Sequence, residues 1–165
     1  YNAGKFIIEK GYTQIGYVAS NRIITNFLKR REGFRTALKE KNLEIPPDFV
    51  FSLNPVELRG TLPKFFYSNK KYPHAIFCED DYMALRLVKE LTKIGIKIPD
   101  QLAIMGFDDI FEDTMINPEL TTIHVPIEQI VRQAINQLEE KVSNTHWLSQ
   151  KSFISTKLIV RESLK

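Results

Sequence analysis

Hydrophobic positions along this chain alternate between short apolar runs and longer segments in which apolar residues recur three or four positions apart. The short runs predict strands, which we place at residues 15–19, 49–53, 74–78, 102–107, 120–125 and 153–160. The helical spacing predicts helices at residues 3–10, 27–41, 56–67, 82–94 and 127–142, of which the third must kink or begin at Pro63. This alternation indicates an α/β fold built on a doubly wound parallel sheet.

Acidic side chains follow two of the predicted strands at the point where each strand ends. Glu79, Asp80 and Asp81 follow one strand, and Asp108 and Asp109 follow the next. The carboxyl ends of parallel strands meet at one edge of an open sheet, which is where such sheets bind ligands. With right-handed crossovers, that edge gathers three loops, at residues 20–30, 79–81 and 106–109. The pattern therefore predicts a ligand site.

Composition narrows the class of protein without naming a function. The 165 residues, 43% hydrophobic and 26% charged, suit one globular domain or one and a half. The net charge of +3 includes no run of five like charges, so this segment is not expected to bind nucleic acid itself. The single Cys78 excludes an internal disulfide and, within an apolar strand, indicates a buried residue in a reducing cytoplasm. We find no apolar run near the ~18 residues of a membrane helix, and no export signal.

Several motifs occur in an order typical of one family, and together they span nearly the whole chain. They are RREGFRTAL (30–38), AIFCEDDYMAL (75–85), GIKIPDQLAIMGFDD (95–109), PELTTI (118–123) and LIVRES (158–163). This set resembles the effector-binding core of lac/gal-repressor-type bacterial transcription regulators. The resemblance implies a two-lobed fold similar to the type I periplasmic sugar-binding proteins. A small effector, commonly a sugar, sugar phosphate or nucleobase, would bind between the lobes.

The resemblance also implies how the chain is divided. Residues 1–123 correspond to the C-terminal lobe, residues 124–150 to the crossover and a helix of the N-terminal lobe, and residues 151–165 to the return strand. Most of the N-terminal lobe, and the helix-turn-helix domain that holds the operator DNA, are expected to be absent from this chain. The helix at 127–142 would then lack its sheet. Its seven apolar positions represent on the order of 10 kcal/mol of transfer free energy, so we expect it to fold back on its own lobe or pair with another copy.

Three residues are implied to bind the effector: Arg30, Asp80 and Asp108. Arg30 would fork onto neighbouring hydroxyls or an acid, and Arg31 is its rival if the register shifts by one. Asp108 would accept hydrogen bonds from effector hydroxyls or ring nitrogens. Asp80 stands where the family often has Asn or Ser. This departure adds negative charge, and a phosphorylated effector is less expected unless Arg30 compensates.

The neighbouring residues are expected to be structural. We predict that Asp81 caps the helix at 82–94, that Asp109 supports the turn, and that His124 forms a structural hydrogen bond. Pro55 occupies the position of the family's aromatic platform, which puts ring stacking in doubt, and Phe51 is expected in the core.

The resemblance further implies a homodimer. Its interface would include an apolar surface formed by Tyr82, Phe111, Met115 and Ile116, for which burial inside one lobe is the alternative.

These observations favour an effector-sensing and dimerisation module of a cytoplasmic transcriptional repressor. The alternative is a periplasmic or lipoprotein sugar-binding protein of a transport system, against which the LIVRES ending and the missing export signal argue. A magnesium-dependent phosphoryl-transfer enzyme would need a lysine at a neighbouring strand end or a glycine-rich phosphate loop, and we find neither. We therefore expect no catalytic residue, no metal and no cofactor.

Overall fold

The computed structural model describes residues 1–53, 64–66, 71–144 and 146–165. Its elements are α1 (Asn2–Glu9), β1 (Ile15–Ser20), α2 (Thr25–Lys39), η1 (Pro47–Phe49), β2 (Val50–Leu53), β3 (Ala75–Cys78), α4 (Asp81–Lys93), β4 (Ala103–Met105), η3 (Phe111–Thr114), β5 (Thr122–His124), α5 (Ile127–Ser143) and β6 (Lys157–Ile159). Pro55 and most of the helix predicted at 56–67 lie outside the described residues.

Four parallel strands form the sheet, in the order β2-β1-β3-β4. Isolated parallel bridges, Met105 with Thr121 and Asp108 with His124, place the β5 segment beside β4. The chain thus winds outward from β1 in one direction and from β3 in the other, so the α/β doubly wound prediction is confirmed. The last strand, β6, is antiparallel to β5 and shorter than the predicted 153–160.

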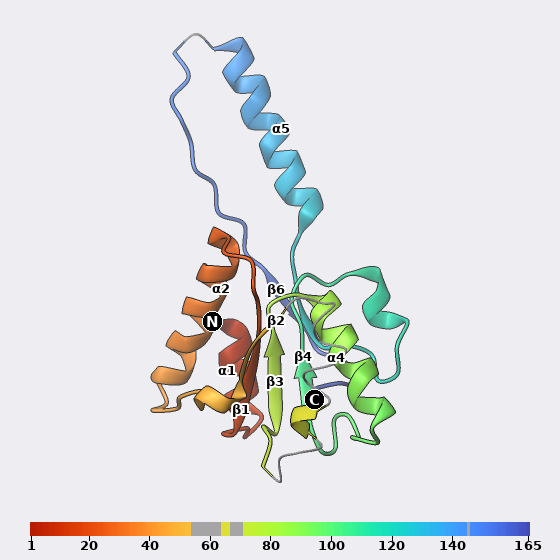
Figure 1. Ribbon diagram of the computed structural model, residues 1–165. Helices are drawn as coiled ribbons and strands as arrows, with labels where there is room; N and C mark the ends of the chain where they lie inside the picture. Colours follow the sequence, from red (N-terminus) through yellow and green to blue (C-terminus); the bar gives the residue numbers. More distant parts are fainter. Residues whose placement is uncertain (54–63, 67–70, 145) are drawn as a thin grey trace.

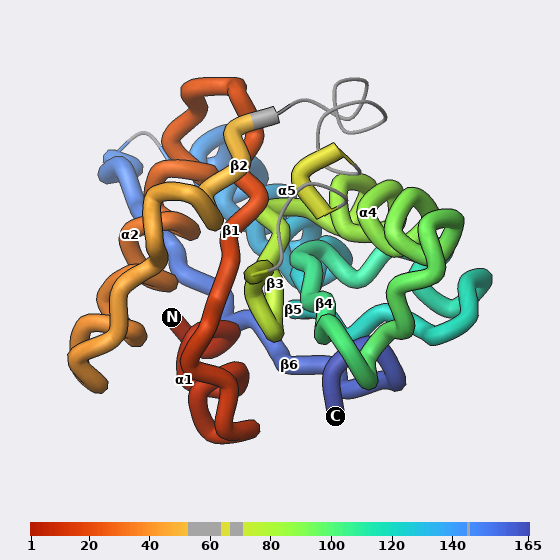
Figure 2. Tube along the Cα trace, turned by 60° about the horizontal axis from the view of Figure 1, so that its bottom comes forward, coloured from red at the N-terminus to blue at the C-terminus, as the bar shows by residue number. Residues whose placement is uncertain are grey.

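The sheet has a buried layer on each face because side chains alternate along every strand. In β3, Ala75 and Phe77 pack with α1 and α2, whereas Ile76 and Cys78 pack with α4. Figures 1 and 2 show these helices on opposite sides of the strands. Cys78 is buried and unpaired, as predicted, and Phe51 belongs to the core.

Asp80, and not Asp81, caps α4. Asp80 has an extended backbone conformation and its side chain accepts a hydrogen bond from the Met83 amide at 2.8 Å. The prediction that Asp81 is the cap is wrong by one residue, because Asp81 already has helical geometry and its side chain is buried. The apolar stripe of α4 packs on the sheet, and the helix ends near Gly95, whose φ of +85° suits glycine.

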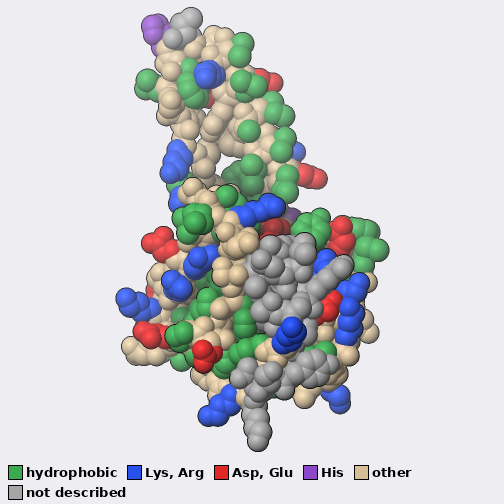
Figure 3. Space-filling view, viewed as in Figure 1, with side chains coloured by type: hydrophobic (Ala, Val, Ile, Leu, Met, Phe, Trp, Pro, Cys, Tyr) green, Lys and Arg blue, Asp and Glu red, His purple; other side chains and the backbone are tan. Residues whose placement is uncertain are grey.

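α5 projects away from the rest of the molecule, and residues 146–156 return beside it (Figure 1). None of the α5 residues is buried, and its contacts to the returning segment include hydrogen bonds from Gln133 and Gln137 to the Ser152 hydroxyl. Hydrophobic side chains are visible along this arm in Figure 3. The prediction that this helix folds back is therefore wrong: α5 does not pack on the sheet, whose faces α1, α2 and α4 already cover. Among the described residues, no helix combines the length and apolarity needed to cross a membrane.

Candidate functional site

The carboxyl ends of β1, β3 and β4 meet at one edge of the sheet, where hydrogen bonds join their loops. The Ser20 amide donates to the Glu79 carboxylate at 2.6 Å. The Arg30 guanidinium donates through Nη1 to the Glu79 carbonyl at 2.6 Å and through Nη2 to Asp108 Oδ1 at 2.9 Å. The three loops thus converge as predicted. They do so where the strand order reverses between β1 and β3, the usual ligand position in open α/β sheets.

Arg30 is held in one orientation by rings as well as by hydrogen bonds. Its guanidinium carbon lies 3.8 Å from the centroid of the Phe107 ring and 5.5 Å from that of Phe27. Such stacking fixes the guanidinium plane. Two of its N–H donors are used by the described residues, which leaves donors for a ligand.

Asp108 combines partial burial with an unusual backbone. Its φ of +135° is rarely adopted by residues other than glycine, and such conformations cluster at ligand sites. Burial raises the pKa of Asp108 to about 6, against the opposing effect of the Arg30 charge. The nearby Asp81 and Asp80 charges raise it further. The carboxylate keeps 34% of its side-chain surface exposed, so a ligand can reach it.

Asp80 lies within the electrostatic reach of the other two predicted site residues. Burial raises the pKa of Asp80, the hydrogen bond from the Met83 amide opposes this, and the Arg30 charge lowers the pKa. Because one of its oxygens caps α4, Asp80 is partly committed to structure. The structure therefore brings Arg30, Asp80 and Asp108 to one edge.

Glu79 organises this edge, although no sequence motif assigned it a role of its own. Its buried carboxylate accepts hydrogen bonds from the Tyr17 hydroxyl at 2.9 Å, the Ser20 amide, and Arg31 at 2.9 and 3.1 Å. Arg31, the rival of Arg30, is thus paired with Glu79. Burial, with the adjacent Glu79 charge, raises the pKa of Tyr17 well above its usual range. The partners of Glu79 lie 48 to 62 residues away in sequence. The one local feature that could have indicated its role is its position directly after a predicted strand.

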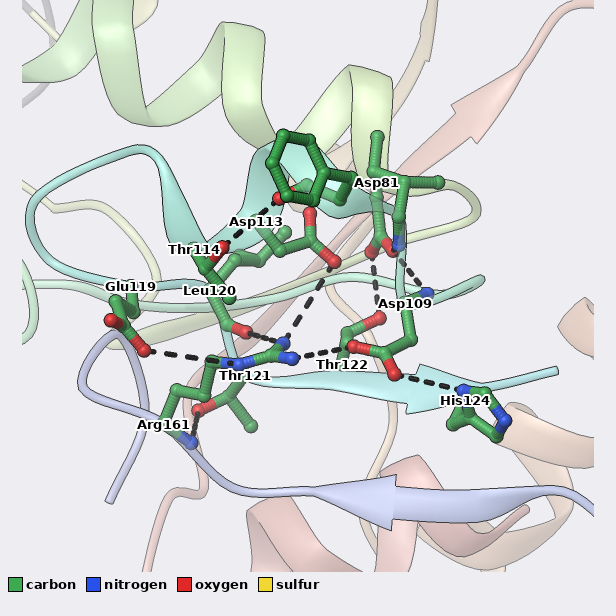
Figure 4. Close-up of polar contacts among 12 residues, drawn as sticks. Asp81, Asp109, Asp113, Thr114, Glu119, Leu120, Thr121, Thr122, His124 and Arg161 are labelled. Atoms are coloured by element: carbon green, nitrogen blue, oxygen red, sulfur yellow. Dashed lines mark hydrogen bonds and ion pairs between the residues drawn. The ribbon is translucent and has the colours of Figure 1, made fainter. Parts of the chain in front are cut away.

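A second polar network, drawn in Figure 4, supports the turn that presents Asp108. Asp109 pairs with Arg161 at 2.6 Å and with His124 Nδ1 at 2.8 Å, and its amide donates to Asp81 at 2.6 Å. A Cβ at Gly106 would collide with the Asp81 carboxylate, so this position requires glycine. The structural roles predicted for Asp109 and His124 are confirmed.

Hollows open on two sides of this edge. One, of about 340 Å³, is lined by Ser20, Arg22, Phe27, Asp80, Tyr82 and Arg86. The other, of about 250 Å³, includes Arg30 and Phe107 in its wall. Neither of these two hollows contains all three predicted site residues, since the first includes Asp80 and the second includes Arg30.

The surface predicted for a dimer interface is largely exposed. Tyr82, Phe111 and Met115 keep 59%, 79% and 67% of their surface exposed, whereas Ile116 packs against the core. The alternative of burial inside one lobe therefore fails for three of the four. A hollow of about 840 Å³ runs along α4 beside Tyr82 and Ile116. In the described part of the chain, no group of three acidic, His or Cys residues could hold a metal ion.

Known proteins match this chain over nearly its whole length. Residues 5–164 match a family model described as a periplasmic binding protein-like domain. The HTH-type transcriptional repressor PurR of Haemophilus influenzae is 35% identical over 170 residues, and that of Histophilus somni is 31% identical over 167. Each alignment covers all of this chain and 50% of the relative, so the chain spans about half the length of the curated relatives it matches.

Solved structures show the same fold. The sugar-binding transcriptional regulator of the LacI family from Escherichia coli, complexed with phosphate, has a TM-score of 0.85 at 24% identity. The Escherichia coli transcriptional repressor AscG has the same TM-score and identity. Both comparisons cover 99% of this chain and 59% of the solved chain.

Proposed function

The chain belongs to the periplasmic binding protein-like domain family, and from this membership we propose that it senses a small effector for a DNA-binding transcriptional repressor. The relatives named above are HTH-type repressors and regulators of the LacI family. In this proposal the chain supplies the C-terminal side of the effector site and takes part in dimerisation. Operator DNA is bound in the cytoplasm by an N-terminal helix-turn-helix domain of the full-length regulator.

The observation that carries the proposal is the contact of Arg30 with Asp108 beneath an open edge of the sheet. A guanidinium fixed by Phe107 and by the Glu79 carbonyl offers donors, while Asp108 offers acceptors beside them. Donors and acceptors held side by side match the hydroxyls of a sugar-like molecule, which both donate and accept. The group needs no rearrangement to bind, since its partners already hold it.

We infer a neutral, hydroxyl-rich effector in preference to a phosphorylated one. Asp80 and Asp108 place two carboxyl groups at the edge, and Arg31 is already paired with Glu79. Among the described residues, Arg30 is the cation whose charge acts on both acids. A doubly charged phosphate held between the two carboxylates would meet their repulsion, although Arg22 and Arg86 also line the hollow at Asp80.

The proposal includes a division of the chain between the two lobes of a regulator. We propose that residues 1–123 form the C-terminal lobe, that residues 124–150 cross into the N-terminal lobe, and that residues 151–165 return. The unburied apolar face of α5 supports this division because it would be covered by the other lobe. We likewise place Tyr82, Phe111, Met115 and Ile116 at the homodimer interface.

The same comparisons support binding without turnover. The relatives are regulators, not enzymes, and their names also disfavour a transport role. An effector that binds one arrangement of the lobes better than another would change operator affinity by that difference.

A thermal-shift panel on the full-length regulator tests the proposal. Neutral mono- and disaccharides, matched sugar phosphates and nucleobases would be compared for saturable stabilisation. We expect a neutral sugar to raise the melting temperature of the wild type and of Asp48→Ala, an exposed control on η1, and not of Asp108→Ala. Equal stabilisation of Asp108→Ala would show that the site lies elsewhere.

A further inference from the structure

Asp113, on η3, is a buried acid with no described hydrogen-bond donor. Its exposed surface is 0%, and neither side-chain oxygen accepts a hydrogen bond from a described donor. The nearest ion pair within the described part of the chain joins its Oδ2 to Arg161 Nη1, 3.9 Å away. Figure 4 shows the Asp113 carboxyl group between Arg161 and Asp81. An ionised carboxylate left in this way would lose its hydration without replacement.

The positive charge of Arg161 is already committed to other groups. Its Nη2 contacts Asp109 at 2.6 Å and its Nη1 donates to the Leu120 carbonyl at 2.8 Å. Its Nε also lies 3.9 Å from Glu119. A charge shared among these acceptors cannot fully compensate a further buried anion.

Asp81, the other acid beside Asp113, acts as an acceptor. It receives hydrogen bonds from the Asp109 amide at 2.6 Å, the Ile110 amide at 3.3 Å and the Thr122 hydroxyl at 2.7 Å. Because its oxygens are occupied by donors, a proton shared between the two acids belongs on Asp113. Two buried carboxyl groups in one site favour retention of one proton.

We propose that a proton on Asp113 locks η3 against the first turn of α4, and that its loss in alkaline solution loosens this segment. Burial raises the pKa of Asp113 to about 8, with further contributions from hydrogen bonding to Asp81 and from the Asp81 charge. The Arg161 charge opposes this rise, and the Asp109 charge adds to it. His124 and Glu119 act one step further away, since they contact Asp109 and Arg161 respectively.

The η3 segment connects the turn that presents Asp108 to the exposed apolar surface that includes Phe111 and Met115. η3 begins two residues after Asp109 with the exposed Phe111, and it ends directly before the exposed Met115. Loosening of η3 would change this apolar surface and relax the turn that presents Asp108. The Asp113 proton would act on η3 whether or not an effector is bound.

Ionisation of Asp113 lowers the folding stability as the pH rises. In an unfolded chain Asp113 has its ordinary pKa of 3.8, so between about pH 4 and 8 the folded chain holds more protons than the unfolded chain. Folding stability contributed by this group is therefore complete below about pH 4, falls as the pH rises to about 8, and is constant above.

A carbon-13 NMR titration of the aspartate carboxyl groups tests the proton directly in the wild-type chain. We expect one carboxyl resonance to titrate near pH 8 and to be missing from Asp113→Asn. If every aspartate of the wild type titrates below pH 7, the proposal is overturned.

Denaturant unfolding at pH 6.5 and pH 9 provides the second test. We expect the unfolding midpoint to fall with pH by clearly less in Asp113→Asn than in the wild type, because the amide cannot ionise. The matched control is Glu112→Gln, which removes an exposed acid from the same turn and should keep the wild-type fall. An equal fall in Asp113→Asn and the wild type would contradict the lock.

Discussion

Arg30 owes its orientation to groups from different parts of the chain. The Glu79 carbonyl follows β3, Asp108 and Phe107 follow β4, and Phe27 lies on its own helix, α2. The guanidinium is therefore fixed before any ligand arrives, which reduces the entropy lost on binding. The resemblance of RREGF and GFDD to a known family pointed to Arg30 and Asp108, but the aromatic clamp was not predicted.

Effector affinity should fall as the pH falls through about 6. Burial raises the pKa of Asp108 to about 6, and the ionised carboxylate supplies the hydrogen-bond acceptors. The affinity for the effector should therefore be highest above this pH and decrease below it. Calorimetric titration of the effector at pH 5 and pH 7.5 would measure a loss of roughly tenfold for each pH unit below 6. An Asp108→Asn variant should show weaker binding that does not vary with pH in this range, and a pH dependence unchanged in that variant would contradict the assignment.

Glu79→Gln should destabilise the chain by about 3 kcal/mol, because it breaks a buried ion pair and leaves hydrogen-bond partners unsatisfied. Denaturant unfolding at pH 7 measures this loss. Glu32→Gln, on the exposed side of α2, should change stability by less than about 0.5 kcal/mol. Equal stability of the two variants would mean that the Glu79 network contributes little.

At the scale of the elements, hydrophobic patterning was sufficient for the order of strands and helices. Alternation in the strand before Glu79, and a stripe from Met83 to Leu91, each identify a buried face without any knowledge of the partner. Patterning could not predict the pairing of the last strand. The apolar Phe153 suggested a strand, yet it is 82% exposed and only Lys157–Ile159 pairs with β5.

The shift of the helix cap from Asp81 to Asp80 has a physical reason. A cap is defined by the backbone conformation of one residue, and two consecutive aspartates before an apolar stripe fit the pattern equally well. The networks of Glu79 and Asp113 are similar cases. Their partners lie far away in the sequence, so no local pattern could identify which acid is buried and which faces solvent.

Substitution of the cap separates its structural role from its charge. Asp80→Ala should lower stability by about 1 kcal/mol, whereas Asp80→Asn, which retains a capping oxygen, should cost a few tenths. Helix content and thermal unfolding of both variants measure the difference. If alanine and asparagine destabilise equally, the contribution of Asp80 comes from its charge and not from the cap.

The apolar face of α5 should mediate self-association when the other lobe is missing. None of its residues is buried, so Ile135→Asp should change the free energy of unfolding of the chain by less than about 0.5 kcal/mol relative to the wild type. It should, however, reduce the association of this chain that sedimentation velocity detects at high concentration. The polar-face variant Glu139→Ala serves as the control. Monomeric behaviour of the unmodified chain at all concentrations would contradict this expectation.

At the scale of the whole molecule, strand order determines where the site lies. Because the sheet winds outward from β1 and β3 in opposite directions, their carboxyl ends leave a crevice that the Arg30 and Glu79 contacts border. The chain spans about half the length of its relatives, and α5 presents an uncovered face. Both facts support a site completed by a second lobe that closes over the first.

The most direct test is a crystal structure of the full-length regulator with the neutral compound that stabilises it most. We predict that the compound lies at the carboxyl ends of β1 and β3, with oxygen atoms within hydrogen-bond distance of both the Arg30 guanidinium and the Asp108 carboxylate. A compound bound along α4 near Ile116, or one that contacts neither side chain, would contradict this function.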